Sequence, residues 1–245
     1  MQNLKGKVVA ITGASAGIGK AIAIKLAENG VKLVLGARNT EQLENIVDEI
    51  KNNNGDAISL KTDVTQKKDL IHLVNKAVEK YGKLDVMINN AGIAQLSRID
   101  ELDVDGWEQM ININIKGVLY GMAAAIPVFK QQQSGHIVNI ISTSGIKIVP
   151  TQGIYAGTKN AVRTISEAFR QESEGTIRIT GISPGVVKTD FANNIKNKDM
   201  KMVIQQNMEQ LAISPEYIAN AVIYAISQPK EVEVGDIVIR PAKQN

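Results

Sequence analysis

The chain has 245 residues, with 28 lysines and arginines against 25 aspartates and glutamates, and a formal net charge of +3 at pH 7. This mild balance differs from the clustered basic surface of nucleic-acid-binding proteins, so we expect no nucleic-acid partner. The sequence has no cysteine and two histidines, which excludes disulfides, thiolate metal sites and cysteine nucleophiles and argues against a histidine metal centre.

Short β-branched runs alternate with helical patterns along the chain. The predicted strands are 7–11, 32–36, 57–61, 84–89, 136–141, 176–183 and 237–240, and the predicted helices are 17–29, 40–53, 67–81, 103–132, 155–174 and 215–227. This alternation predicts parallel strands joined by crossover helices. No linker or repeat interrupts the pattern, so we expect residues 1–245 to form one doubly wound α/β domain.

The N-terminal stretch leads directly into the first apolar strand and carries no pattern of a signal peptide. The longest uncharged apolar run, 117–129, contains Pro127 and is too short to span a bilayer. We therefore expect a soluble cytoplasmic protein that has no membrane partner.

A glycine-rich loop joins the first predicted strand to the first predicted helix. It reads TGASAGIG and places glycine at positions 13, 17 and 19. At such a junction, the unpaired N–H groups and the dipole of the helix favour bound phosphate. The position indicates a nucleotide-binding loop, with a tight turn and close helix–strand packing as the alternative.

The turn after the second strand indicates which dinucleotide is preferred. NAD-binding units usually place an acid there for the ribose hydroxyls, whereas a basic residue suits a 2′-phosphate. Here the turn has no acid and carries Arg38, while Ser15 in the glycine loop can add a hydroxyl contact. We predict that NADP(H) is preferred over NAD(H), with a solvated arginine as the alternative.

A tyrosine and a lysine with helical spacing suggest acid–base chemistry. Tyr155 and Lys159 lie four residues apart and share one helix face, so the ammonium is expected to lower the phenol pKa. Tyr120 with Lys116 gives the same pair in reverse order, so spacing alone does not choose between them. Ser142 follows the fifth strand at the carboxyl edge of the sheet, where doubly wound folds build their sites.

Together these motifs resemble the short-chain dehydrogenase/reductase family over nearly the whole chain. The resemblance is carried by TGASAGIG, TDVT, INNAG, NIKG, HIVNIIS, YAGTK, SPGVVKT and DIVIRP, in that order. It implies a compact Rossmann fold with a seven-stranded, mostly parallel sheet and helices on both faces. It also implies an NADP(H)-dependent oxidoreductase, in a homotetramer or homodimer, that interconverts a secondary alcohol and a ketone or aldehyde.

The resemblance further implies roles for individual residues. Ser142 and Tyr155 would hold the carbonyl oxygen, Tyr155 would supply the proton, and Lys159 would bind the nicotinamide ribose and lower the pKa of Tyr155. Asn114 would hold a water that relays the proton. The implied cofactor-binding residues are Gly13, Ser15, Gly17, Ile18, Gly19, Arg38, Asp63, Val64, Asn90, Ala91, Gly92, Tyr155, Lys159, Pro184, Gly185, Val187 and Thr189.

The sequence departs from the family pattern at two positions. Ile141 stands where a second serine is common, and Asn39 rather than a basic residue follows Arg38. The second departure weakens the prediction of NADP(H) preference. Neither touches the serine, tyrosine and lysine of the expected catalytic set.

The substrate side is less specific. The polar, methionine-dotted segment 188–212 is predicted to be a lid over the cleft, with a solvated surface helix as the alternative. The expected pocket wall consists of Ala94, Gln95, Ser144, Ile146, Gln152, Val186 and this lid. Such a mixed wall suits a small or medium-sized hydroxy or keto compound, with a 3-hydroxy acid such as serine as an alternative.

Two other expectations concern function and assembly. A non-catalytic dinucleotide-binding redox sensor of the same fold is the alternative function, although such a protein could lose Tyr155 or Lys159 without cost. A sugar epimerase or dehydratase is disfavoured because we see no large C-terminal substrate domain. Apolar positions such as Ile165 and Phe169 predict outward helix faces that pair between subunits.

Overall fold

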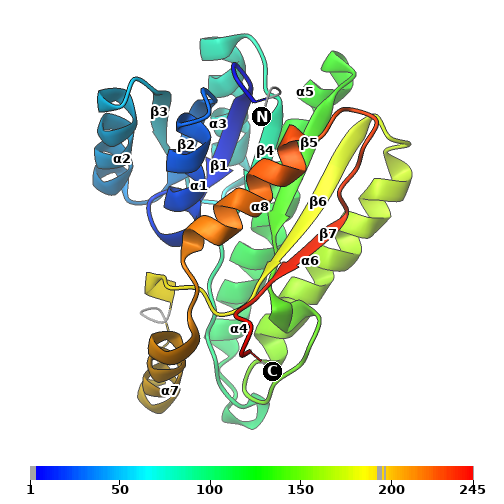
Figure 1. The fold of residues 1–245 in the computed structure, drawn as a ribbon. Coiled ribbons are helices and arrows are strands. Elements are labelled where there is room, and N and C mark those ends of the chain that lie inside the picture. Colours follow the sequence, from blue (N-terminus) through cyan, green and yellow to red (C-terminus); the bar gives the residue numbers. More distant parts are fainter. Residues whose placement is uncertain (1–3, 192–194, 196, 245) are drawn as a thin grey trace.

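A computed structural model describes residues 4–191, 195 and 197–244. Its centre is a sheet of seven strands in the order β3-β2-β1-β4-β5-β6-β7, and every strand pair in it is parallel (Figure 1). The strands are β1 (Val8–Thr12), β2 (Lys32–Ala37), β3 (Asp56–Lys61), β4 (Val86–Asn89), β5 (Gly135–Ile140), β6 (Ile177–Pro184) and β7 (Asp236–Ile239). The predicted doubly wound fold is confirmed.

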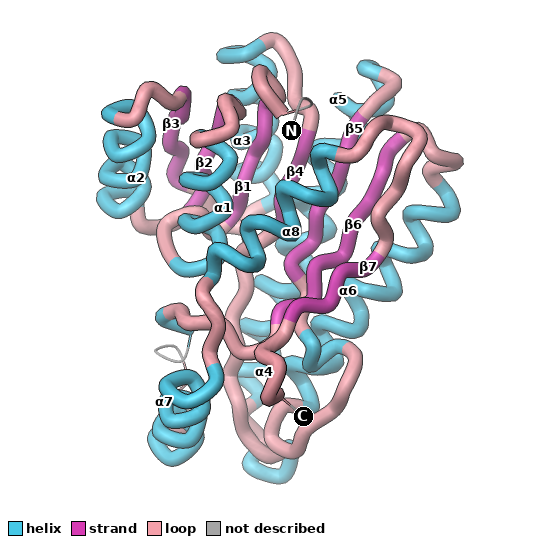
Figure 2. Tube along the Cα trace, in the orientation of Figure 1, coloured by secondary structure: helices cyan, strands magenta, loops and turns pink. Residues whose placement is uncertain are grey.

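Helices cover both faces of the sheet, as expected for the wholly buried strands β1 and β4. The helices are α1 (Gly17–Ala27), α2 (Thr40–Asn52), α3 (Lys67–Tyr81), α4 (Val104–Met110), α5 (Gly117–Gln132), α6 (Gly153–Glu172), α7 (Lys198–Leu211) and α8 (Pro215–Ser227). One apolar cluster lies under α1, α2 and α8, and a second lies under α3, α5 and α6. The loops at the carboxyl ends of the strands gather at one end of the molecule with α4 and α7 (Figure 2).

The predicted helix 103–132 is continuous from Val104 to Gln132, but it contains one wide π-helical turn at Ile111–Lys116. Asp103 caps its start, since the side chain accepts a hydrogen bond from the Gly106 N–H at 3.2 Å. Periodicity alone did not predict the π turn. Such turns are rare and occur frequently at functional sites.

This long helix is the one helix in the described part of the chain that could span a bilayer by length and composition. The uncharged run 117–129 was expected to be too short to span a bilayer, but the whole helix that contains it is long enough. The helix nevertheless lies on the sheet, because Ala125 is fully buried and a side chain at Gly121 would collide with Asn89 on β4. It has the place of a core helix.

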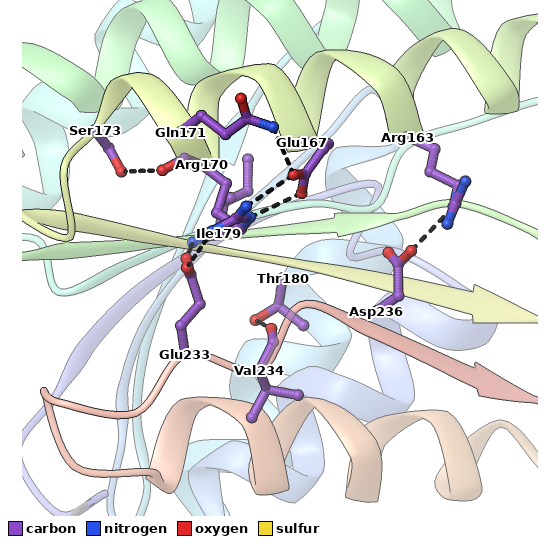
Figure 3. Close-up of polar contacts among 10 residues, drawn as sticks. All are labelled: Arg163, Glu167, Arg170, Gln171, Ser173, Ile179, Thr180, Glu233, Val234 and Asp236. Carbon is purple, nitrogen blue, oxygen red and sulfur yellow. Dashed lines mark hydrogen bonds and ion pairs between the residues drawn. The ribbon is translucent and has the colours of Figure 1, made fainter.

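The end of the sheet at β7 is held by side chains rather than by a long strand (Figure 3). The Ile179 N–H on β6 lies before the paired part of β7, and it donates to Glu233 Oε1 at 2.8 Å. Arg163 on α6 pairs with Asp236 at 2.9 Å, and Arg170 lies 4.0 Å from Glu233. Exposed ion pairs contribute little, so the bond to the main chain matters most here.

The expected outward position of Ile165 and Phe169 is only partly correct. Both side chains are half-buried and pack against the core beneath α6. They therefore contribute to the core of one chain and give less support for subunit pairing than their pattern suggested. Assembly into dimers or tetramers stays a prediction.

A buried histidine on β5 makes the stability of the fold depend on pH. Thr180 Oγ1 donates to the Val234 carbonyl at 2.7 Å, so it accepts from His136 Nε2 at 2.8 Å. His136 Nδ1 is buried and has no partner in the described structure. Burial, with the nearby charges of Arg178 and Lys7, lowers the pKa of His136 from 6.5 to about 3.

We expect the free energy of unfolding to fall as the pH drops below about 6.5. In this range His136 binds a proton in the unfolded chain but stays neutral in the folded protein. The slope should approach ~1.4 kcal/mol per pH unit toward pH 5 and become small above about pH 7.5. Urea unfolding at pH 7.5, 6.0 and 5.0 measures it, with His136→Asn as the non-titrating control. Equal slopes in the two proteins would contradict the assignment to this residue.

Candidate active site

A cavity of about 830 Å³ opens at the carboxyl edge of the sheet. Its walls come from the loops after β1 to β6, from α6 and α7, and from the C-terminal tail after β7. Ligand sites of doubly wound folds lie at this edge, and the volume falls within the range of about 300–1,000 Å³ typical of such sites.

The glycine loop begins one wall of this cavity. Gly13 and Gly17 both have positive φ, at +64° and +53°, a conformation that side chains disfavour. Gly13 also packs against the loop after β4, where an added Cβ would lie 2.8 Å from Ala91 Cα. Gly19 has another role, because a Cβ there would collide with the Gly13 carbonyl. It does not line the cavity, so close packing explains this third glycine.

The N-terminus of α1 faces the cavity without a side-chain cap. Ala16 occupies the N-cap position and makes no side-chain hydrogen bond, and the first turn contains no acid. The first N–H groups of a helix have no intrahelical partner, and the helix dipole makes this end positive. Ser15, Ala16, Gly17 and Ile18 line the cavity here. The local structure fits a pyrophosphate.

Arg38 lies on the cavity wall after β2, as the sequence predicted. It is exposed, and its guanidinium forms no hydrogen bond or ion pair with the residues the structure describes. The neighbouring Asn39 is instead committed to the fold, because its side chain caps α2 by accepting from the Gln42 N–H at 3.1 Å. Arg38 therefore offers an unpaired positive charge at this wall of the cavity.

The loops after β3 and β4 complete the expected adenosine side. Asp63 and Val64 line the cavity, and Asp63 Oδ1 accepts from both the N–H and the hydroxyl of Thr65. Asn90, Ala91 and Gly92 also line the cavity. The Asn90 amide donates to the carbonyls of Thr12 and Gly13 at 3.0 Å, so its side chain holds the glycine loop in place.

Ser142, Tyr155 and Lys159 meet at the other end of the cavity. All three side chains are buried. Lys159 Nζ lies 5.9 Å from the centre of the Tyr155 ring and donates to the Ile140 carbonyl at 2.9 Å. Ser142 Oγ accepts from the Ser144 N–H at 3.1 Å and interacts with the Tyr155 hydroxyl.

The electrostatics differ from the sequence-based expectation. Burial raises the pKa of Tyr155 to about 12, opposed only by the hydrogen bond with Ser142. Burial also lowers the pKa of Lys159 to about 8. The expected lowering of the Tyr155 pKa by Lys159 is not found in this structure, because desolvation is the largest cause of the shift and the Lys159 charge is not among the causes. Tyr155 is therefore a protonated acid at neutral pH.

Asn114 lies in the π turn behind these residues and does not line the cavity. Its side chain accepts from the Ile93 N–H at 2.9 Å and donates to the Ile93 carbonyl at 2.8 Å and to Thr158 Oγ1 at 3.1 Å. A Cβ on Gly92 would lie 3.3 Å from Lys159 Nζ and 3.4 Å from Asn114 Oδ1. Asn114 thus joins the loop after β4 to α6 close to Lys159.

An apolar group forms the wall beyond Tyr155. The Phe191 ring lies 5.8 Å from the Tyr155 ring, and Ile204 and Met208 reach the same wall from α7. The predicted lid therefore contributes Phe191 and α7, whereas its residues 192–194 and 196 lie outside the described part of the chain. The signal for Phe191 was only its place in that segment.

The polar part of the substrate wall is small. Ser144 Oγ donates to Gln152 Oε1 at 2.8 Å, and the Gln152 amide N–H₂ has no partner among the described residues. Ala94, Ile146 and Val186 line the cavity as expected. Gln95 does not, because its side chain is buried behind the wall. Its sequence neighbours Ala94 and Leu96 both line the cavity, so proximity in the sequence was a poor guide for Gln95.

The remaining residues predicted to bind the cofactor also reach the cavity. Pro184, Gly185, Val187 and Thr189 line it from the loop after β6. Of the residues predicted to be catalytic or cofactor-binding, only Gly19 and Asn114 are absent from its lining. Sequence reasoning missed Gln244 in the C-terminal tail, which lines the cavity together with the loop after β6.

A parallel sheet of this order, with a glycine loop beside an uncapped helix N-terminus, defines a Rossmann-type nucleotide-binding protein. Residues 7–200 match the family model described as short chain dehydrogenase. The chain belongs to the short-chain dehydrogenase family, and the resemblance seen in the sequence is confirmed. It is an oxidoreductase of that family, whose members bind a nicotinamide dinucleotide.

Two relatives match over the full chain. An uncharacterised oxidoreductase of Listeria monocytogenes is 48% identical over 244 residues, covering 98% of each chain. An uncharacterised oxidoreductase of Staphylococcus saprophyticus is 45% identical over 249 residues, covering 100% of each chain. Neither description names a substrate.

Solved structures of similar proteins contain both forms of the cofactor. An alcohol dehydrogenase from Thermococcus sibiricus in complex with 5-hydroxy-NADP is 31% identical, with a TM-score of 0.87 and 98% of each chain covered. A closed serine dehydrogenase with NADP+ is 30% identical, with a TM-score of 0.90 and 97% of this chain and 96% of that chain covered. A Burkholderia phymatum family member with NAD is 26% identical, with a TM-score of 0.89 and 97% and 90% covered.

Proposed function

We propose that this protein is an NADP(H)-dependent oxidoreductase that interconverts a secondary alcohol and a ketone or aldehyde. The proposal rests chiefly on one observation. Buried Ser142, Tyr155 and Lys159 lie in the same cavity as an uncapped helix N-terminus and an unpaired Arg38. A dinucleotide-dependent reaction needs acid–base groups beside the nicotinamide and anion-binding groups beside the phosphates. The two ends of this cavity offer these two kinds of group.

The residues present fit the cofactor. The first turn of α1, with Gly13 and Gly17, would hold the pyrophosphate, and Arg38 with Ser15 would hold the 2′-phosphate. Lys159 would hold the nicotinamide ribose, and Val187 and Thr189 would lie beside the nicotinamide. The bound cofactor supplies a hydride for reduction or accepts one in oxidation.

The proton chemistry follows from the side chains themselves. With its pKa raised to about 12, Tyr155 carries its proton at neutral pH and can deliver it to a carbonyl oxygen held by Ser142. The resulting charge on Tyr155 is stabilised by the nearby Lys159 ammonium. Asn114 would hold the water through which Tyr155 regains its proton. Alcohol oxidation needs the deprotonated phenol, so its rate should increase with pH.

The substrate wall favours a carbonyl compound of small or medium size with an apolar substituent. Phe191, Ile204 and Met208 supply the apolar surface, and the unpaired Gln152 N–H₂ can donate to a second oxygen of the substrate. The serine dehydrogenase among the similar structures supports a 3-hydroxy acid as the second candidate class.

A screen of NADPH oxidation over aldehydes, ketones, keto esters, diketones, quinones and 3-hydroxy acids tests the proposal, with the acids assayed in the direction of NADP+ reduction. We expect turnover with at least one class. Tight NADPH binding without turnover over the whole panel would favour the redox sensor instead. We further propose a cytoplasmic homotetramer or homodimer without nucleic-acid or membrane partners, and light scattering at micromolar concentration tests the assembly.

A further inference from the structure

The chain after β7 returns to the cavity in a defined way. β7 ends beside β6, where the Gly185 N–H donates to the Ile239 carbonyl at 2.7 Å. Pro241 is then buried, and the Gln244 N–H donates to the Pro241 carbonyl at 2.9 Å. This turn brings the Gln244 side chain to the cavity wall.

The Gln244 carboxamide joins two loops that come from different strands. Its Oε1 accepts from the Val186 N–H at 2.9 Å, in the loop after β6. Its Nε2 donates to Thr143 Oγ1 at 3.3 Å, in the loop after β5. Thr143 directly follows Ser142, and Val186 directly precedes Val187, so each bond lies one residue from a group in the proposed site.

The packing around Gly185 matches the same contact. A Cβ on Gly185 would collide with Gln244 Oε1 and would lie 2.7 Å from the Arg240 Cβ. Gly185 does not have positive φ, so the glycine is not required by backbone conformation. The close approach of the tail explains why a glycine follows Pro184.

We propose that Gln244 is a positioning residue, which fixes the loop after β6 and the loop after β5 at the nicotinamide end of the cavity. The inference rests on the proposed function. Without the carboxamide, the two loops have no side-chain link through the tail, and ordering them would then cost free energy at each binding event. Gln244 therefore supports both cofactor affinity and the placement of Ser142.

Gln244→Leu tests the proposal, because leucine keeps much of the bulk and removes both hydrogen bonds. We expect the Kd for NADPH, measured by fluorescence titration, to rise roughly five- to a hundredfold, as expected for two lost hydrogen bonds. We also expect kcat to fall with an active substrate from the screen. Lys243→Ala changes the exposed neighbour in the same turn and should leave both values unchanged.

A double-mutant cycle with Thr143→Val separates positioning from general stability. The changes in NADPH affinity should be less than additive, because Thr143→Val removes one of the bonds that Gln244→Leu also removes. An unchanged Kd in Gln244→Leu, even with a lower Tm, would overturn the proposal, as would full additivity. If the wild-type protein binds neither NADPH nor NADH, the proposed function itself fails and this role with it.

Discussion

Tyr155→Phe should lower kcat for carbonyl reduction by about 10²–10⁴-fold while the Kd for NADPH stays within a few-fold. The ring remains, so its contact with Phe191 at 5.8 Å and its place in the apolar cluster are retained. Only the hydroxyl that would give its proton to the substrate is lost. Steady-state kinetics with an active substrate, together with a fluorescence titration of NADPH, measures both quantities.

Tyr120→Phe is the matched control. Tyr120 is the tyrosine of the second pair with Lys116, but it lies on α5, is half-buried against the core and does not line the cavity. The control should keep nearly all of the wild-type kcat. If Tyr155→Phe retained most of its activity, or if Tyr120→Phe lost as much, Tyr155 would not be the proton donor.

Replacing Lys159 is a second test of the same site. Lys159 has a pKa of about 8, so the protein loses this positive charge as the pH rises above 8. We interpret Lys159 as support for the charged form of Tyr155, and therefore expect Lys159→Ala to lower kcat and to raise the KM for the cofactor. A change in only one of these would limit Lys159 to a single role.

Arg38→Asp should reverse or strongly reduce the preference for NADPH. The 2′-phosphate is roughly doubly charged near neutral pH, and a guanidinium can give it paired, charge-assisted hydrogen bonds. Such bonds contribute about 1.5–3 kcal/mol, or roughly ten- to a hundredfold in affinity. Aspartate would instead repel the phosphate and accept from the ribose hydroxyls. We expect kcat/KM for NADPH to fall at least about tenfold, with NADH unchanged or improved.

Lys51→Asp is the control for charge, because it makes the same change in net charge at an exposed position on α2 away from the cavity. The ratio of kcat/KM for NADPH to that for NADH should not change in this variant. A wild-type preference for NADH, or an unchanged ratio in Arg38→Asp, would leave Arg38 as a solvated surface charge and remove the NADP(H) assignment.

Much of the fold was predictable because its signals are local. Apolar β-branched runs and helical periodicity depend on neighbouring residues, so all seven strands and the crossover helices were placed with boundaries shifted by at most two residues. The glycine loop, Arg38 and the Tyr155–Lys159 spacing were visible for the same reason. Even the start of the long helix at Asp103 follows a local capping pattern.

The rest depends on contacts between residues distant in the sequence. Burial raises the pKa of Tyr155, Phe191 packs on its ring, and Gln244 reaches Thr143 across 101 positions. Glu233 accepts the Ile179 N–H on the β7 side of β6, and Gly19 packs closely against the Gly13 carbonyl. No local pattern encodes such contacts, because desolvation and hydrogen-bond geometry exist only after the sheet brings its carboxyl edge together. The sequence determined which chemical groups this protein has, and the tertiary structure decided their surroundings.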